Sequence, residues 1–276
     1  MTANAETITE SSASNPWEED LRLILDAARL AGDEALRHFR QSPDVWYKNG
    51  GSSPVSAADI AANNVLRELL HPARPAYGWL SEENEDDESR LSCPTVFVVD
   101  PIDGTRAFLA GKPTWCVSVA VVHQGRPVAG VLVAPALKEE FQASLTGAAR
   151  KNDIAITVSG IRQPPVTLAV AEDTLARLDP AYRSTVQRIE HVPSLAYRLA
   201  MIADGRIDGT IVKRNSHDWD IAAADLILQR AGGKLLGLDA QSLAYNRATV
   251  RHGVLCAASS AIMPGLLAAV GSGAGH

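Results

Sequence analysis

Cysteine, aromatic residues, positive charge and long apolar runs are all scarce in this sequence of 276 residues. The three cysteines lie far apart, so they form neither the close spacing of a zinc site nor the framework of a disulfide-stabilised secreted protein. No run of about 18 apolar residues is present, so we expect no membrane-spanning helix. A formal net charge of -6 does not fit a sequence-independent nucleic-acid binder, which is usually basic. The remaining composition is that of an ordinary globular protein.

The two ends of the chain are poor in apolar residues. We expect residues 1–15 and the Gly-rich tail 271–276 to be disordered and flexible. Because residues 1–15 lack the apolar segment of a secretory signal and the cysteines are scattered, the sequence predicts a cytoplasmic protein. Between the ends we expect two α/β lobes, residues 16–150 and 151–270.

Apolar periodicity predicts the elements within these lobes. The first lobe begins with helices over residues 16–39 and 57–70, and mostly antiparallel strands follow. The second lobe alternates between strands and helices. Its expected strands are 166–170, 188–192, 207–212 and 254–258, and its expected helices are 194–203, 219–231 and a last one that ends near 269.

The stretch Asp-Pro-Ile-Asp-Gly-Thr at residues 100–105 is the most informative motif, because it directly follows the apolar run 95–99. Two carboxylates therefore emerge at the end of a buried strand, next to a glycine where the backbone can approach a ligand closely. This arrangement suits a hard divalent cation that holds a phosphate. An isolated Asp-Gly-Thr is also common in turns, so the interpretation depends on other residues.

Further acidic residues stand at the ends of predicted elements. Glu82 follows a short strand and Asp220 begins a helix, so that with Asp100 and Asp103 they can surround one or two Mg²⁺ ions. The carbonyl of Ile102 offers another oxygen, and no His/Cys cluster supports zinc instead. Taken singly, an acidic run is usually a solvated loop, and an acid at a helix start is ordinary. The joint placement favours the metal site.

Four motifs together resemble the inositol monophosphatase-like family of lithium-sensitive phosphatases, and most of all its 3′(2′),5′-bisphosphate nucleotidases. They span about residues 17–265 and form a highly specific set. These motifs are Glu82-Glu83 after a strand, the stretch 100–105, Trp219-Asp220-Ile221-Ala222-Ala223 in a helix that ends at Gly232-Gly233, and Lys48 followed by Ser56 and Asp59 before a helix.

The resemblance implies a layered α/β/α/β/α sugar-phosphatase fold of two lobes, within the α/β (α+β) class. It also implies Mg²⁺-dependent hydrolysis of a small phosphomonoester, with two or three ions, Mn²⁺ as a possible substitute, inhibition by Li⁺, and a homodimer. Carried over residue by residue, the catalytic residues are Thr105, Asp59 and Glu82, with Thr105 and Asp59 activating the water. The metal ligands are Glu82, Asp100, Ile102, Asp103 and Asp220, and the amides of Gly104 and Thr105 hold the phosphate while Lys48 belongs to the substrate site.

One departure from the family pattern concerns the substrate. Inositol monophosphatases commonly carry a Glu seven residues before the aspartate of the Trp-Asp motif, but this chain has Lys213, followed by Arg214. A cation cannot accept hydrogen bonds from sugar hydroxyls, whereas it suits a second phosphate. We expect the segment from Ser194 to contribute charge through Arg198 and a stacking face through Tyr197. The favoured substrate is therefore 3′-phosphoadenosine 5′-phosphate, although Lys213 and Arg214 fit a solvated loop equally well.

Three alternatives stay open. The first is an inositol-1-monophosphatase or another sugar or polyol monophosphatase. The second is a phosphatase with a nucleophilic Asp in an Asp-x-Asp-Gly-Thr motif, which the three-residue spacing of Asp100 and Asp103 disfavours. The third is a catalytically silent binding protein, which the retention of every ligand carboxylate disfavours. A second departure, Ala110 where members often have a polar residue, concerns only the loop at the substrate mouth.

Overall fold

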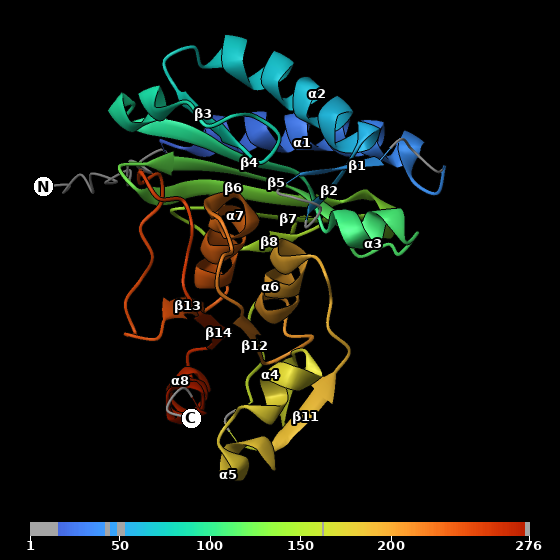
Figure 1. Cartoon of the computed structure of the whole chain (residues 1–276). Coiled ribbons are helices and arrows are strands. Elements are labelled where there is room, and N and C mark those ends of the chain that lie inside the picture. Colours follow the sequence, from blue (N-terminus) through green and yellow to red (C-terminus); the bar gives the residue numbers. More distant parts are fainter. Residues whose placement is uncertain (1–15, 42–44, 49–52, 162, 274–276) are drawn as a thin grey trace, which may run out of the picture.

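The computed structural model describes residues 16–41, 45–48, 53–161 and 163–273. Its helices and strands are stacked in alternating layers, which follow one another from top to bottom in Figure 1. A helical layer, a seven-stranded sheet, a second helical layer, a five-stranded sheet and an outer helical layer succeed each other. The predicted layered α/β/α/β/α fold is thus confirmed.

The first layer consists of α1 (Glu18–His38) and α2 (Ala57–Ala73), which lie side by side on one face of the large sheet (Figure 1). The buried stripe of α1 is rich in alanine, and these small side chains let the helix approach both α2 and the sheet closely. A hairpin of β1 (Val45–Lys48) and β2 (Ser53–Ser56) leads into α2.

In the large sheet, β3 and β4 are parallel and the other neighbours are antiparallel. The central strands are almost continuously apolar because helices cover both faces. The strands follow in chain order across the sheet: β3 (Gly78–Ser81), β4 (Thr95–Asp103), β5 (Cys116–His123), β6 (Arg126–Ala134), β7 (Glu139–Ser144), β8 (Arg150–Lys151) and β9 (Ile154–Ala155). Short helical turns follow β3, β4 and β6 as η2 (Glu88–Ser92), α3 (Thr105–Leu109) and η3 (Pro135–Leu137).

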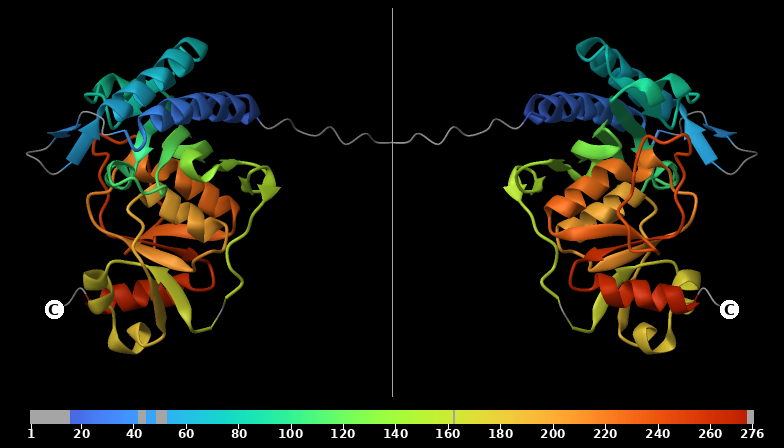
Figure 2. Two further views of the ribbon diagram at one scale, coloured as in Figure 1. Left: turned by 90° about the vertical axis from the view of Figure 1, so that its right-hand side faces the viewer. Right: turned by 90° about the vertical axis from the view of Figure 1, so that its left-hand side faces the viewer.

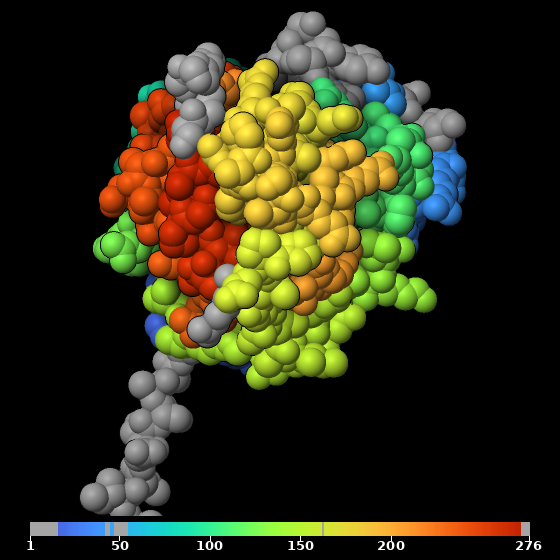
Figure 3. Space-filling model, turned by 90° about the horizontal axis from the view of Figure 1, so that it is seen from below, coloured from blue at the N-terminus to red at the C-terminus, as the bar shows by residue number. Residues whose placement is uncertain are grey.

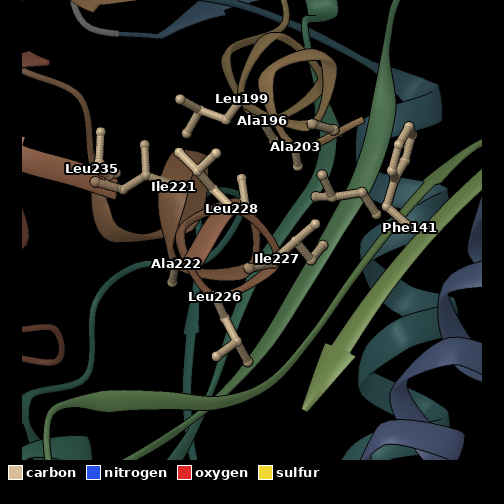
Figure 4. Packing of buried hydrophobic residues seen from close by; sticks show 14 of the residues in the cluster. Phe141, Ala196, Leu199, Ala203, Ile221, Ala222, Leu226, Ile227, Leu228 and Leu235 are labelled. Carbon is tan, nitrogen blue, oxygen red and sulfur yellow. The ribbon is translucent and has the colours of Figure 1, made fainter. Parts of the chain in front are cut away.

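The middle layer contains α6 (Leu195–Ala203) and α7 (Asp218–Arg230), which are buried on nearly every side. Figure 4 shows Leu199 of α6 and Leu228 of α7 among apolar side chains that also include Phe141 of β7 and Leu235 of the small sheet. One apolar cluster therefore joins both sheets.

The small sheet is mixed, with the strand order β11-β10-β12-β14-β13. Its outer face carries α4 (Glu172–Ala176), α5 (Pro180–Arg183) and α8 (Met263–Gly273). The side views of Figure 2 and the view from below in Figure 3 show α8 beside the segment that contains α5. The strands are β10 (Val166–Ala169), β11 (Val186–Ile189), β12 (Gly209–Val212), β13 (Gly233–Gly237) and β14 (Leu255–Ser259).

Three expectations differ from the structure in detail. The strand expected over 188–192 is β11 at Val186–Ile189, because the carbonyl of Val192 bonds the guanidinium of Arg198 instead of a strand neighbour. Helix α8 extends to Gly273, into the segment 271–276 that was expected to be flexible. Strands β7, β8, β9 and β13 had no clear sequence signal. None of the described helices is long and apolar enough to cross a membrane. The lobe boundary near residue 150 stays a prediction, and residues 1–15 lie outside the described part of the chain.

Candidate active site

The site is assembled where the strand pair β3–β4 ends. Glu82 follows β3, and Asp100 and Asp103 lie at the C-terminal end of β4. Asp59 and Asp220 lie in the first turns of α2 and α7. Segments far apart in the sequence therefore deliver their carboxylates to one place, as the strand ends and helix starts predicted.

The carboxylates of Asp59 and Asp220 are held in the same way. Each is the third residue of its helix in a capping box: one oxygen of Asp59 accepts the Ser56 amide at 2.8 Å, and one oxygen of Asp220 accepts the His217 amide at 2.7 Å. The second oxygen of Asp59 faces the Thr105 hydroxyl at 3.1 Å. A capping bond thus fixes each side chain while one oxygen is kept for another partner.

Strand β4 leaves its regular register between Asp100 and Asp103. The Asp100 carboxylate accepts the Ile102 amide at 3.0 Å, and the Ile102 carbonyl lies 3.2 Å from the Thr105 hydroxyl. Gly104 then turns the chain with φ +94°, and a Cβ there would lie 2.8 Å from the Cβ of Ser194. Only glycine fits this turn, which starts α3 directly at the site.

Glu82, Asp100 and Asp220 form the cluster that can hold a metal ion. One carboxylate oxygen from each lies within 4.8 Å of the others. The pKa of Asp100 lies well above its ordinary value, first because the side chain is buried and then because of the negative charges of Glu82, Asp103 and Asp220. Convergent oxygen donors that repel one another fit a hard divalent cation, which would relieve that repulsion.

Asp103 lies beside this cluster but has protein partners of its own. Its carboxylate accepts the Ser194 hydroxyl and the amides of Leu195 and Ala196, the latter at 2.7 Å, at the start of α6. Burial, followed by the charge of Asp220, raises the pKa of Asp103 to about 7, although these hydrogen bonds lower it. Its role as a further metal ligand stays a prediction.

Two predicted substrate residues turn out to be structural. Ser194 is fully buried and caps α6, where its hydroxyl donates to Asp103 and accepts the Tyr197 amide. Tyr197 is only 3% exposed, its ring packs against Phe141, and its hydroxyl donates to Glu139 at 2.8 Å. The predicted stacking role of Tyr197 is therefore wrong, because no face of the ring is open to a base.

The predicted cationic substrate residues differ in burial and in their partners. Arg198 is 5% exposed; it donates to the Val192 carbonyl and to the His191 ring, while its buried Nε has no hydrogen-bond partner in the described part of the chain. Burial, and then the charges of Arg198 and Lys213, lower the pKa of His191 to about 4, so the ring is neutral and accepts from Arg198. Lys213 is exposed and pairs with Asp173 at 2.8 Å.

The other two predicted cations, Arg214 and Lys48, are not grouped with Arg198 and Lys213 in the described structure. Arg214 lines a cavity together with the segment 237–255, and Lys213 is not among the residues that line it. Lys48 is the last residue of β1, and its side chain lies outside the described part of the structure.

Sequence reasoning missed a buried network behind the metal cluster. Arg90 is 1% exposed, binds Asp86 with two nitrogens at 2.6 and 2.7 Å, and donates to the Asn246 side chain at 2.7 Å. The Asn246 amide donates to Asp218 at 2.7 Å, and Asp218 also binds His252 at 2.7 Å. The network ties the loop after Glu82 to the first turn of α7. No local sequence motif predicts this network, because the residues that form it are far apart in the chain.

Comparisons with known proteins agree with this geometry. The sequence profile of the inositol monophosphatase family matches residues 17–273. An inositol-1-monophosphatase from Mesorhizobium japonicum is 32% identical over 234 residues, which cover 79% of this chain and 85% of the relative. A histidinol-phosphatase from Chlorobaculum parvum is 30% identical over 262 residues, which cover 92% and 97%.

Solved structures share the fold over nearly the whole chain. The extragenic suppressor protein suhB from Bartonella henselae superimposes with a TM-score of 0.81 at 30% identity, covering 91% of this chain and 98% of that one. CysQ from Bacteroides thetaiotaomicron, described as a bacterial member of the inositol monophosphatase family, gives a TM-score of 0.73 at 21% identity, covering 88% and 98%. The second likeness concerns the fold alone.

Proposed function

This chain belongs to the inositol monophosphatase family and is a phosphoric monoester hydrolase, and on that premise we propose that it is a Mg²⁺-dependent phosphatase of small bisphosphate nucleotides. Members of this family depend on a metal, and the cluster of Glu82, Asp100 and Asp220 offers the oxygen donors that Mg²⁺ prefers. Two or three ions, replacement by Mn²⁺ and inhibition by Li⁺ are part of this proposal.

Bound at this cluster, divalent cations would offset the negative charge of the phosphate and lower the pKa of a water molecule, so that the water loses a proton more readily as it attacks phosphorus. The chain supplies the remaining parts. Thr105 donates its hydroxyl hydrogen to Asp59, which leaves its oxygen lone pairs to accept a hydrogen bond from the attacking water. Burial raises the pKa of Asp59, so its carboxylate is a stronger base than an exposed one and suits removal of the water's proton.

The phosphate is oriented by backbone groups. Gly104 immediately precedes α3, and the first amides of a helix have no acceptor within that helix. The amides of Gly104 and Thr105 can therefore bind phosphate oxygens, which approach without obstruction because residue 104 has no side chain. The hydrolysis needs no covalent intermediate on the enzyme.

Buried Arg198 is the observation on which the choice of substrate rests. The positive charge of Arg198 interacts electrostatically with Asp103. Its Nε has no hydrogen-bond partner among the described residues, and its neighbour His191 is neutral. Lys213, which also acts on His191, adds a second positive charge at the protein surface. A second phosphate of the substrate would meet exposed Lys213 and the positive field of buried Arg198, whereas an inositol phosphate offers only hydroxyl groups to them. We therefore favour 3′-phosphoadenosine 5′-phosphate.

The second candidate is an inositol-1-monophosphatase. It is supported by relatives of that name at 32% and 33% identity. The two candidates differ in the group that Lys213 meets, so a charge change at this position separates them.

The test compares kcat/KM for 3′-phosphoadenosine 5′-phosphate and inositol 1-phosphate in the same Mg²⁺ buffer. We expect the wild type to prefer the bisphosphate, and Lys213→Glu to reduce this preference by about tenfold, as for loss and reversal of a charge contact at the rim of a site. Asp173→Asn is the matched variant, because it removes the carboxylate that neutralises Lys213. It should raise the preference. Equal turnover of both substrates, or a ratio that neither variant changes, would contradict the proposed substrate.

A further inference from the structure

A cavity of about 480 Å³ lies beside the loop that connects β12 to α7. It is lined mainly by the segment 237–255, which includes the connection between β13 and β14, and by Arg214. None of the carboxylates predicted to bind metal lines it. Its volume lies within the range of about 300–1,000 Å³ that is usual for sites of small molecules.

Three arginines line this cavity: Arg214, Arg247 and Arg251. No hydrogen bond or ion pair of their side chains exists with other described residues. By contrast, Arg29, Arg74, Arg90 and Arg206 each bind a carboxylate. Three exposed arginines therefore line one hollow of a protein whose net charge is -6.

Little negative charge opposes them. Asp239 is the one carboxylate among the lining residues, and its oxygen accepts the amide of Gln241. His252, which also lines the cavity, is bound to Asp218 through Nε2. The lining therefore keeps an excess of fixed positive charge, because guanidinium groups do not lose their proton in proteins.

We propose that this hollow, the arginine cavity, is a second anion site that binds a phosphate group, either free or carried by an organic molecule. Guanidinium groups bind phosphate oxygens through paired N–H donors, which makes arginine the preferred residue for such recognition. The cavity volume leaves room for an organic part beside the phosphate. The site goes beyond the hydrolytic reaction, since the metal cluster contributes none of its lining.

The wall of the arginine cavity is connected to the metal site. The Arg247 carbonyl accepts a hydrogen bond from Arg90, and the backbone of Arg251 pairs with that of His217. His217 in turn fixes Asp220 through its amide. An anion that orders residues 247–251 therefore also restrains the first turn of α7, so occupancy should change metal affinity at Asp220.

The site can be tested without metal. In excess chelator the carboxylates of the metal cluster repel anions, so inorganic phosphate should not bind among them, and the arginine variant then tells the cavity from the cations Arg198 and Lys213. Titration calorimetry with inorganic phosphate should show one site in the wild type, and Arg247→Ala/Arg251→Ala should weaken it at least tenfold. Arg183→Ala, which removes an exposed arginine on α5, should bind like the wild type. Absence of binding in the wild type, or equal affinity of the double variant, would overturn the proposal.

A second arm identifies the source of the phosphate and shows that the double variant is folded. With Mg²⁺ restored, its turnover of p-nitrophenyl phosphate should match that of the wild type. A raised KM for 3′-phosphoadenosine 5′-phosphate would then assign the arginine cavity to the remote phosphate of the substrate. An unchanged KM, together with lost binding of inorganic phosphate, would assign it to a separate anion. Because the calorimetry needs no turnover, it fails or succeeds independently of the proposed substrate.

Discussion

The carboxylate of Asp100 lies where a negative charge is unfavourable as long as no cation is bound. It is 2% exposed and surrounded by Glu82, Asp103 and Asp220, so that burial and like charges both raise its pKa. A raised pKa means that the folded chain holds its proton more tightly than the unfolded chain does. The unfavourable contribution to stability is therefore complete above the folded pKa, and it disappears as the pH falls toward the unfolded value of about 4.

Metal-free protein should consequently become more stable as the pH is lowered from 8 to 5.5. Asp103, whose pKa is about 7, contributes over this window together with Asp100. Thermal unfolding in excess chelator measures the effect, and saturating Mg²⁺ should remove it because the cation neutralises the same charges. If the melting temperature of the chelated protein decreases as the pH is lowered from 8 to 5.5, the assignment is contradicted.

Asp100→Asn should separate stability from activity. The variant loses a charged ligand and should retain less than about a thousandth of the phosphatase activity, since the cation is central to the reaction. At pH 8 without metal, the same change removes a repelling charge and should raise the melting temperature by at least about 2 °C, which corresponds to roughly 1 kcal/mol in a protein of this size. A variant that is both inactive and less stable in chelator would argue for a purely structural role of Asp100.

The pair Thr105 and Asp59 should act on kcat rather than on binding. Their hydrogen bond of 3.1 Å prepares a base and leaves the metal cluster intact. Thr105→Ala should lower kcat by about 10²–10³, within the range for general base catalysis, with a KM change below threefold. Thr105→Ser keeps the hydroxyl and should recover most of the rate. Equal losses in both variants would assign the defect to the methyl group and its packing.

At the scale of elements, the two capping boxes explain why acidic residues at helix starts were informative. The first-turn positions of Asp59 and Asp220 could be predicted from sequence because the apolar helix that follows each is a local signal, whereas the role of Asp59 followed from the family resemblance and stays a prediction. The hydrogen bonds of Asp103 to α6 could not be predicted, since they join residues about ninety positions apart. The burial of Tyr197 escaped prediction for the same reason, because Phe141 and Glu139 come from a strand without a clear signal.

The network of Arg90 and Asn246 should set the affinity for metal. It connects the loop that carries Glu82 with the start of α7 that carries Asp220. Asn246 has φ +53°, so Asn246→Gly removes the side chain without new backbone strain. We expect Mg²⁺ activation to require a concentration about tenfold higher, as for the loss of groups that position metal ligands.

Asn246→Asp is the matched control for this experiment, because it keeps the oxygen that accepts from Arg90. It should need less additional Mg²⁺ than the glycine variant does. An unchanged Mg²⁺ requirement in Asn246→Gly would show that the network serves folding alone.

At the scale of the whole molecule, the site lies across the junction of the two sheets. Glu82 and Asp100 come from the large sheet, whereas Asp220 belongs to α7, which packs between both sheets. The family resemblance was sufficient to predict that these residues lie together, because its motifs include residues of the large sheet and of α7. The arginine cavity was not predictable, since Arg214 and the segment 237–255 meet only through the antiparallel pairing of β12, β13 and β14.

Because the candidate ligands come from different layers, we expect metal binding to be a property of the complete fold. Because one apolar cluster contains residues of both sheets, calorimetry should record a single unfolding transition rather than one for each lobe. Saturating Mg²⁺ should shift that whole transition upward, by about 2.7 kcal/mol at a hundredfold excess over Kd. Asp220→Asn removes the ligand from α7 alone and should abolish the shift for the entire molecule. Two transitions, of which Mg²⁺ moves only the first, would instead mean that the large sheet and its helices bind the cation without α7.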